Sequence, residues 1–393
     1  MTGGALTLGR WFRDRAVVTP ERIAIDFRGE QTTYRQLDRH SERLAAGLLA
    51  AGLAAGDRVA TLTPNRPEHV EVLAACAKAG LLMVPLNPRL APPELAWQLD
   101  DAEPGLLLVG PQLQPLAAAA LAACERAAPL CQELSDLAAL RAADGGRVLD
   151  RAVADDDPLL LIYTSGTTGR PKGAMLTHAN CFWTNLSLDR VIDLTTTDVV
   201  LQVLPQFHVG GWNVQPLLAW WKGATVVLEP AFEPPEALRR IAATGVTTMM
   251  GVPATYLFMA EQPAFGSTDL SSLRQAVVGG APIGARLLQT WHDRGVSLVQ
   301  GYGLTEAAPN VLGLPAEHAA TRLGSAGRPY PHVEVALRDA DGATVHGPGR
   351  GQLVVRGPNV FAGYWRNPQA TATAVVDGWL QTGDIAERDA DGF

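Results

Sequence analysis

The chain of 393 residues is 47% apolar and 18% charged, and it contains 39 glycines and 28 prolines. This composition excludes intrinsic disorder, collagen and coiled coils, and it favours a loop-rich globular fold, either one large domain built of sublobes or two domains. The formal net charge of −8 argues against nucleic acid or anionic lipid as the main partner, so a phosphate-bearing ligand has to be bound locally.

Cysteine usage and apolar runs give no sign of secretion or of a membrane anchor. The four cysteines form no CxxC pair and have no histidine at metal-ligand spacing, so we expect reduced thiols in a cytoplasmic protein. The first 20 residues lack the apolar core of a signal peptide. The longest uncharged run, residues 199–221, is interrupted by Pro205, Gly210, Gly211 and Pro216. We interpret it as buried core and pocket wall, with no integral membrane segment.

Strands and helices alternate from the start of the chain to about residue 300. A capping box formed by Thr33 and Gln36 predicts a helix, and Asn65 is expected to cap a second helix that ends before Gly80. Further helices are predicted after Pro115 and from Pro234, Pro253 and Pro282. Predicted strands cover residues 58–62, 81–86, 106–109, 159–163, 199–204, 224–228, 246–250, 276–278 and 297–300. This alternation is typical of α/β proteins, in which helices cover both faces of a parallel sheet.

The composition and the hydrophobic pattern of the sequence change near residue 325. Short alternating strands such as 333–337 and 352–356 occur there between glycines and prolines. Residues 325–393 are therefore predicted to form a small antiparallel or barrel-like lobe that follows an α/β unit over residues 1–324.

Residues 164–174, which follow the predicted strand 159–163, have the composition of a loop that binds polyphosphate. Three glycines let the backbone turn and offer its N–H groups, hydroxyl side chains add donors, and Lys172 supplies a positive charge. The loop is not a Walker A motif, because Lys172 follows Pro171 and precedes Gly173, and this excludes a P-loop motor or kinase. The expected phosphate ligands are Thr164, Ser165, Gly166, Thr167, Thr168, Gly169 and Lys172.

This loop resembles the phosphate-loop signature of the adenylate-forming (AMP-binding) enzymes, a superfamily of acyl-CoA synthetases, peptide-synthetase adenylation domains and luciferases. Residues 205–211, 278–282, 300–306 and 379–384 resemble four further signatures of the family, in the family's order. The resemblance covers essentially the whole chain, since residues 351–358 and 363–365 are similar to a connecting β segment. Gln352 departs from the family by standing where an acid is usual, and we take its role as structural.

The resemblance implies the large N-terminal domain of the adenylate-forming fold, as in fatty-acyl-CoA ligase-like enzymes. Two helix-covered, mainly parallel sheets are expected over residues 1–324 as two interleaved subdomains, followed by a small β-barrel-like lobe over residues 325–393. The family continues into a hinge and a mobile C-terminal domain that brings a lysine used in adenylation. The chain is therefore expected to end before that hinge and to be incomplete for thioester formation.

The resemblance also implies roles for individual residues. Tyr302 is expected to stack on adenine, Asp384 to accept the ribose hydroxyls and Glu306 to hold Mg²⁺ on the phosphates. His208 is expected at the mouth between the nucleotide and the acyl pocket. The implied catalytic set is Lys172, Thr305, Glu306 and His208. The other implied nucleotide-binding positions are Gly279, Gly280, Ala281, Pro282, Gly301, Gly303 and Thr305.

The acid itself is expected among small and apolar residues beside the phosphates. By family position these are His208, Val209, Gly210, Gly211, Trp212, Tyr256, Gly279, Ala307, Ala308 and Val311. The family's amino-acid activators typically carry an aspartate beside the second signature, and this chain has none there. The resemblance therefore favours a hydrophobic carboxylic acid and leaves open whether it is fatty, aryl or terpenoid.

The implied reaction is ATP- and Mg²⁺-dependent activation of this acid to acyl-AMP with release of pyrophosphate. In the complete enzyme the acyl group then passes to coenzyme A. A carboxylate is already ionised at pH 7, so the first step needs charge neutralisation and alignment instead of a general base. Two alternatives stay open: an acyl-AMP ligase that delivers to an acyl carrier protein, and a non-catalytic module that binds acyl-adenylate.

Overall fold

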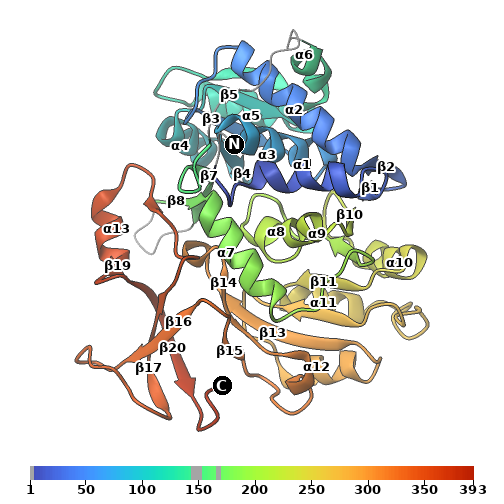
Figure 1. The fold of residues 1–393 in the computed structure, drawn as a ribbon, viewed down its shortest axis with the longest axis vertical. Coiled ribbons are helices and arrows are strands. Elements are labelled where there is room, and N and C mark those ends of the chain that lie inside the picture. Colours follow the sequence, from blue (N-terminus) through green and yellow to red (C-terminus); the bar gives the residue numbers. More distant parts are fainter. Residues whose placement is uncertain (1–3, 143–152, 165–169) are drawn as a thin grey trace.

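A computed structural model describes residues 4–142, 153–164 and 170–393 of the chain. The described strands form three sheets of nine, seven and four strands (Figure 1). No helix among the described residues is long and apolar enough to span a bilayer. The described α-helices are α1 Leu8–Val18, α2 Tyr34–Ala50, α3 Pro67–Ala79, α4 Pro92–Ala102, α5 Gln114–Ala122, α6 Leu137–Ala142, α7 His178–Asp189, α8 Gly210–Asn213, α9 Pro216–Lys222, α10 Pro234–Thr244, α11 Pro253–Ala260, α12 Ala285–His292 and α13 Pro368–Ala374.

The nine-stranded sheet is parallel at its centre. Its order is β15-β14-β13-β12-β11-β9-β10-β1-β2, and the strands from β13 to β1 are parallel to one another. The edge strands β2, β14 and β15 are added antiparallel. The bounds are β1 Ile23–Phe27, β2 Glu30–Thr33, β9 Val199–Gln202, β10 Thr225–Leu228, β11 Thr248–Gly251, β12 Gln275–Val278, β13 Ser297–Gly303, β14 Asn310–Gly313 and β15 Arg328–Pro329.

The seven-stranded sheet has the order β18-β8-β7-β4-β3-β5-β6. Strands β7, β4, β3, β5 and β6 are parallel, and β8 and β18 extend the sheet antiparallel. The bounds are β3 Arg58–Leu62, β4 Leu82–Leu86, β5 Leu106–Val109, β6 Leu130–Glu133, β7 Pro158–Thr164, β8 Lys172–Thr177 and β18 Gly363–Tyr364. The buried apolar runs on β4 and β7 agree with parallel strands that are covered on both faces.

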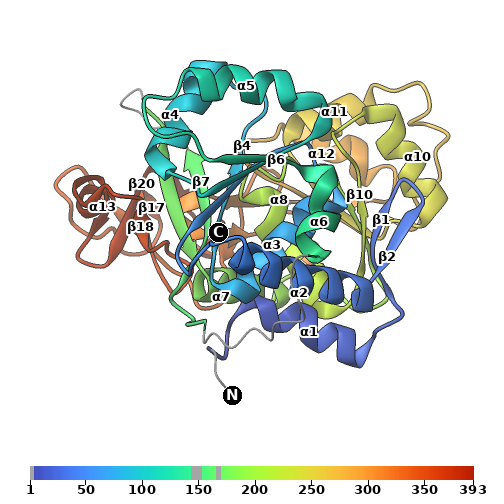
Figure 2. The same ribbon diagram turned by 90° about the horizontal axis from the view of Figure 1, so that it is seen from above.

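Helices and the two large sheets alternate in five layers. Helices α10, α11 and α12 share a buried core with one face of the nine-stranded sheet. Helices α1, α2, α3, α7 and α9 pack between the two sheets in the largest core cluster. Helices α4 and α5 cover the outer face of the seven-stranded sheet, and Figure 2 shows them on the opposite side of β4 and β7 from α1, α2 and α3. The predicted fold class of two helix-covered, mainly parallel sheets is confirmed.

The segment after residue 325 forms the small antiparallel sheet but also joins both large sheets. The small sheet has the order β16-β17-β20-β19, with bounds Glu334–Arg338, Gly349–Arg356, Trp379–Arg388 and Val375–Val376 in that order. Strand β15 belongs to the nine-stranded sheet, and β18 pairs with β8 so that Tyr364 lies opposite Ala174. This pairing brings the late segment next to the strand that begins at Lys172.

The predicted start of α2 is confirmed in detail. Thr33 Oγ1 accepts from the Gln36 N–H at 3.2 Å, and Gln36 Oε1 accepts from the Thr33 N–H at 2.8 Å, which is the reciprocal pair of a capping box. The uncharged run 199–221 forms β9, α8 and α9, most of it buried, as predicted.

The predicted capping role of Asn65 is wrong. The N-cap of α3 is Arg66, with Pro67 as the first helical residue. The Asn65 side chain instead donates to the Leu204 carbonyl oxygen at 2.9 Å and accepts from the Gln206 N–H at 2.8 Å. A local pattern cannot distinguish these roles, because Gln206, which Asn65 binds, lies 141 residues further along the chain. Asn65 thereby fixes the loop that carries His208.

Candidate active site

Three parallel strands bring their carboxyl ends to one edge of the nine-stranded sheet. In the register Gly251 of β11 lies beside Val278 of β12, and Val278 lies beside Gln300 of β13. The glycines that follow, Gly279 and Gly301, therefore lie at the same edge. In open α/β sheets this is the edge at which ligands bind.

Two glycines near this edge are required by close backbone contacts. A Cβ atom on Gly303 would overlap the carbonyl oxygen of Pro309. One on Gly211 would overlap the carbonyl oxygen of Pro205. Any side chain at either position would push apart loops that form the walls of a cavity, so glycine serves the close approach of two backbones here.

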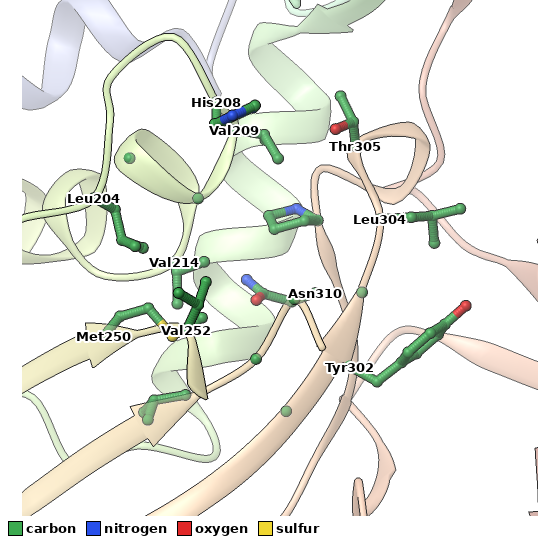
Figure 3. Close-up of a pocket in the computed structure, with 18 of the residues that line it drawn as sticks. Leu204, His208, Val209, Val214, Met250, Val252, Tyr302, Leu304, Thr305 and Asn310 are labelled. Atoms are coloured by element: carbon green, nitrogen blue, oxygen red, sulfur yellow. The ribbon is translucent and has the colours of Figure 1, made fainter. Parts of the chain in front are cut away.

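The cavity at this edge has a volume of about 420 Å³, within the usual range for small-molecule sites. Figure 3 shows Leu204, Val214, Met250 and Val252 on one side and Tyr302, Leu304 and Thr305 on the other, with Asn310 between them. Ten of the predicted site residues line it: His208, Val209, Gly210, Gly211, Gly279, Gly280, Gly301, Tyr302, Gly303 and Thr305. One side of the cavity is thus apolar and the other carries hydroxyl groups.

Tyr302 and Asp384 are joined by a hydrogen bond, although they lie 82 residues apart in the sequence. The Tyr302 hydroxyl donates to Asp384 Oδ2 at 2.6 Å. Burial, together with this carboxylate partner, raises the pKa of Tyr302, so the phenol stays protonated and remains a donor. Asp384 is exposed, and its Oδ1 accepts no hydrogen bond from the described residues. Tyr302 lines both the main cavity and a neighbouring cavity of about 400 Å³, whereas Asp384 lines only the neighbouring one.

Glu306 is the centre of a second polar group. Its Oε1 accepts from the Tyr364 hydroxyl at 2.8 Å and from the Thr164 hydroxyl at 3.4 Å. The Lys172 ammonium lies 5.0 Å from the centre of the Tyr364 ring. Thr164 and Lys172 are cross-strand partners on β7 and β8, so both ends of the predicted phosphate loop lie beside Glu306 or Tyr364. A carboxylate, an ammonium and a hydroxyl from distant segments are thereby gathered at one place.

The middle of the predicted phosphate loop lies outside the described residues. Its members are Ser165, Gly166, Thr167, Thr168 and Gly169. Their contacts with phosphate remain predictions. Ala281 and Pro282 are exposed just after β12 and do not line the cavity.

Five residues that were predicted to line the acyl pocket do not line this cavity, and their role toward the acid stays a prediction. The five are Trp212, Tyr256, Ala307, Ala308 and Val311, and all are fully buried. The Tyr256 hydroxyl donates to the Val277 carbonyl oxygen at 2.8 Å, and the Trp212 indole N–H donates to the Gln206 carbonyl oxygen at 2.6 Å. All five side chains are buried behind the wall, and the polar atoms of Trp212 and Tyr256 are satisfied by backbone carbonyls there.

His208 lies between the cavity and a second one of about 400 Å³. Both cavities are lined by His208 and by Val252, and the second is also lined by Arg89 and Phe258. Partial desolvation and the nearby charge of Arg89 lower the pKa of His208, so the imidazole is neutral at pH 7. His208 thus lies where the two cavities meet, and its place between the nucleotide and the acyl pocket stays a prediction.

Sequence reasoning missed three residues of the site. Tyr364 lies in a segment that the resemblance describes only as a connecting strand, and no signature contains Asn310 or Tyr330, which line the cavity. Asn310 carried a usable signal, because it is a polar residue at the start of an apolar strand directly after the signature that contains Glu306. The contact of Tyr364 with Glu306 spans 58 residues and has no local signal.

Comparison with known proteins identifies the family of the chain. The model of the family described as AMP-binding enzyme matches residues 12–365. The chain is 43% identical to a feruloyl-CoA synthase from Amycolatopsis sp and 38% identical to an indoleacetate–CoA ligase from Aromatoleum aromaticum. These alignments cover 98% and 99% of this chain and 77% of each relative.

Solved structures give the same result for the fold. The N-terminal domain of FACL13 from Mycobacterium tuberculosis superposes with a TM-score of 0.91 at 33% identity and 98% coverage of both chains. The o-succinylbenzoate CoA synthetase MenE from Bacillus subtilis, solved with its acyl-adenylate intermediate, superposes with a TM-score of 0.85 at 30% identity, over 98% of this chain and 76% of that one. The chain therefore belongs to the AMP-binding enzyme family, among the acid–CoA ligases that form carbon–sulfur bonds.

Proposed function

We propose that the chain activates a hydrophobic carboxylic acid with ATP to give acyl-AMP and pyrophosphate, and that the acyl group then passes to coenzyme A. The observation that carries this proposal is one cavity with an apolar side and a hydroxyl-bearing side (Figure 3). An acyl-adenylate of a hydrophobic acid likewise has an apolar acyl half and a polar nucleotide half. The carboxyl group would lie where the two sides meet, near Thr305 and His208.

The nucleotide half is assigned to the side of the cavity that carries Tyr302. In this proposal the Tyr302 ring stacks on adenine, and Asp384 accepts the ribose hydroxyls through the oxygen that has no donor among the described residues. The glycines at the ends of β12 and β13 let a flat ring approach the backbone. The hydrogen bond between Tyr302 and Asp384 would hold both side chains in place before the nucleotide arrives.

The phosphates are assigned to the group around Glu306. Lys172 would supply positive charge and Thr164 and Thr305 hydroxyl donors, so that one anion can approach another. The residues fit Mg²⁺, because Glu306 Oε2 has no hydrogen-bond partner in the described chain and Mg²⁺ in such sites takes few carboxylates plus substrate phosphates. The described residues contain no cluster of three His, Cys, Asp or Glu, so phosphates would have to complete the coordination. Bound Mg²⁺ would neutralise phosphate charge.

The first chemical step then requires charge neutralisation and alignment, and no general base. A carboxylate oxygen of the acid attacks the α-phosphorus, and the bond from that phosphorus to the pyrophosphate oxygen breaks. No proton is transferred, because the acid is already ionised at pH 7. A neutral His208 beside the carboxyl group fits this step, because the step needs no proton from the imidazole.

Coenzyme A is proposed as the acceptor because the relatives are named as CoA ligases or synthetases. The second cavity offers a route for the thiol, since it meets the main cavity at His208 and is lined by the cation Arg89. No observation favours a carrier protein or a purely binding role.

The test is acid-dependent exchange of labelled pyrophosphate into ATP, measured with fatty, aryl, terpenoid and amino acids. The proposal expects exchange with hydrophobic acids and none with amino acids, and loss of exchange in Glu306→Gln while AMP still binds. Exchange that depends on an amino acid, or an unchanged rate in Glu306→Gln, would contradict the proposal.

A further inference from the structure

Asn310 places a polar side chain in the apolar part of the cavity. It is the first residue of β14, lines the cavity, and has an exposed fraction of only 6%. Figure 3 shows its amide end pointing across the cavity toward Val252, away from Tyr302. The neighbouring wall is formed by Val214, Met250 and other apolar side chains, so this amide is a polar group that faces apolar neighbours.

The orientation of the amide is fixed by its partners. Asn310 Nδ2 donates to Thr184 Oγ1 at 3.1 Å and to the Asn213 carbonyl oxygen at 3.2 Å. A backbone carbonyl can only accept, so a flipped amide would place two oxygens against each other. The nitrogen is therefore held in the protein interior and the oxygen Oδ1 faces the cavity. Oδ1 accepts no hydrogen bond from any described residue.

A buried network holds this geometry. The Asn310 N–H also approaches Thr184 Oγ1 at 3.4 Å, and Asn359 Nδ2 donates to the Asn310 carbonyl oxygen at 3.0 Å. Asn185 Nδ2 in turn donates to Asn213 Oδ1 at 3.1 Å. Such a connected set of buried amides keeps the acceptor in one position.

An acceptor that is fixed in an apolar pocket discriminates between ligands. A bound acid that offers a donor satisfies Oδ1, whereas an acid without one displaces water from it and leaves it unpaired. We propose that Asn310 is a specificity-determining residue that selects acids whose apolar body carries a hydroxyl or N–H donor. This inference rests on the proposed function, because it concerns the acid that the same cavity activates.

Tyr330 is a competing polar residue that lines the same cavity. It is buried, lines the cavity, and its hydroxyl has no hydrogen-bond partner among the described residues. A hydroxyl rotates and can donate or accept, so it imposes no single requirement on a ligand. Tyr330→Phe is therefore a matched control for Asn310→Leu, because each variant removes polar atoms from one wall and keeps the size of the side chain.

The experiment compares acids that differ only in the donor: 4-hydroxycinnamate with cinnamate, and indole-3-acetate with benzofuran-3-acetate. The measured quantity is the ratio of kcat/KM within each pair for acid-dependent pyrophosphate exchange. For at least one pair we expect the native chain to prefer the donor-bearing acid by about tenfold or more. Asn310→Leu should bring that ratio to one or below, and Tyr330→Phe should retain it.

If the role of Asn310 is merely structural, Asn310→Leu lowers kcat/KM equally for the two acids of a pair and leaves their ratio unchanged. That result would overturn the inference. Native ratios at or below one for both pairs would also overturn it, even if Asn310→Leu does not fold. A collapse of the ratio in Tyr330→Phe alone would assign the selection to Tyr330 instead. Absence of exchange with every acid would be a failure of the proposed function and is separate from these results.

Discussion

Lys172 is one of three lysines in a chain that otherwise uses arginine as its cation. Its ammonium has no ion-pair partner among the described residues and lies over the Tyr364 ring. We expect Lys172→Ala to lower ATP-dependent exchange by about 100-fold or more, because it removes a charge that stabilises the transferring phosphate. The unfolding free energy should change by less than about 1 kcal/mol, the usual size of an exposed cation–π contact.

The matched control is Lys222→Ala. Lys222 pairs with Asp189 at 2.9 Å and is not part of either polar group of the site. Steady-state exchange kinetics and urea unfolding of both variants separate the two effects. Equal activity of the Lys172 and Lys222 variants would refute the phosphate role of Lys172.

Asp384 is the second single residue whose replacement has a predicted effect. Its carboxylate is proposed to accept ribose hydroxyls, so Asp384→Ala should weaken AMP binding by about 10- to 100-fold, the range for hydrogen bonds to a charged group. Calorimetric titration with AMP measures this. The control is Asp341→Ala, which removes an exposed carboxylate from a turn of the same segment. An AMP affinity that is the same in both variants would exclude Asp384 from the nucleotide site.

At the scale of elements, α3 and α7 each carry a buried neutral histidine. Burial lowers the pKa of His69 to about 3 and that of His178 to about 4. Both values lie below the pKa of about 6.5 in an unfolded chain. As the pH falls below 6.5, the unfolded chain binds protons that the folded chain does not, so stability falls. The loss of stability continues until the pH falls to the pKa values of the two histidines in the folded chain.

Between pH 7 and pH 5.5 each of these histidines should lower the unfolding free energy by about 1 kcal/mol. His178 accepts the Leu8 N–H on Nδ1 at 3.1 Å, so its replacement by glutamine keeps an acceptor and removes the titration. Urea unfolding at the two pH values should show a weaker pH dependence in His178→Gln than in the native chain. His346→Gln, at an exposed position, is the control. The same pH dependence in all three proteins would contradict the assignment.

Elements whose signals are local could be predicted from the sequence, and those that depend on distant partners could not. The capping box of α2 involves residues three apart and was predicted, whereas Asn65 has the composition of a cap but binds a loop far along the chain. The helix expected from Pro282 begins at Ala285, since a proline marks a boundary only within a few residues. The order of strands in each sheet was not predicted, because periodicity carries no information about neighbours.

The distinction between local signals and contacts with distant residues also applies to the whole molecule and its site. Family resemblance placed His208, Tyr302 and Thr305 at the cavity, because signatures after consecutive parallel strands converge at one sheet edge. Trp212 and Tyr256 do not line the same cavity, since the direction of a side chain depends on packing that a motif does not encode. The contacts of Glu306 and Tyr364 with their partners also depend on how the late segment folds back onto the seven-stranded sheet.

The central claim is that one cavity holds both halves of an acyl-adenylate. The most direct measurement is calorimetric titration of this chain with a hydrolysis-resistant acyl-sulfamoyl adenosine, with AMP and the free acid as separate ligands. We expect the joined molecule to bind at least about 100-fold more tightly than AMP, because the second half binds at a high effective concentration. An affinity no greater than that of AMP would show that the apolar side of the cavity does not receive the acyl group, and would contradict the account.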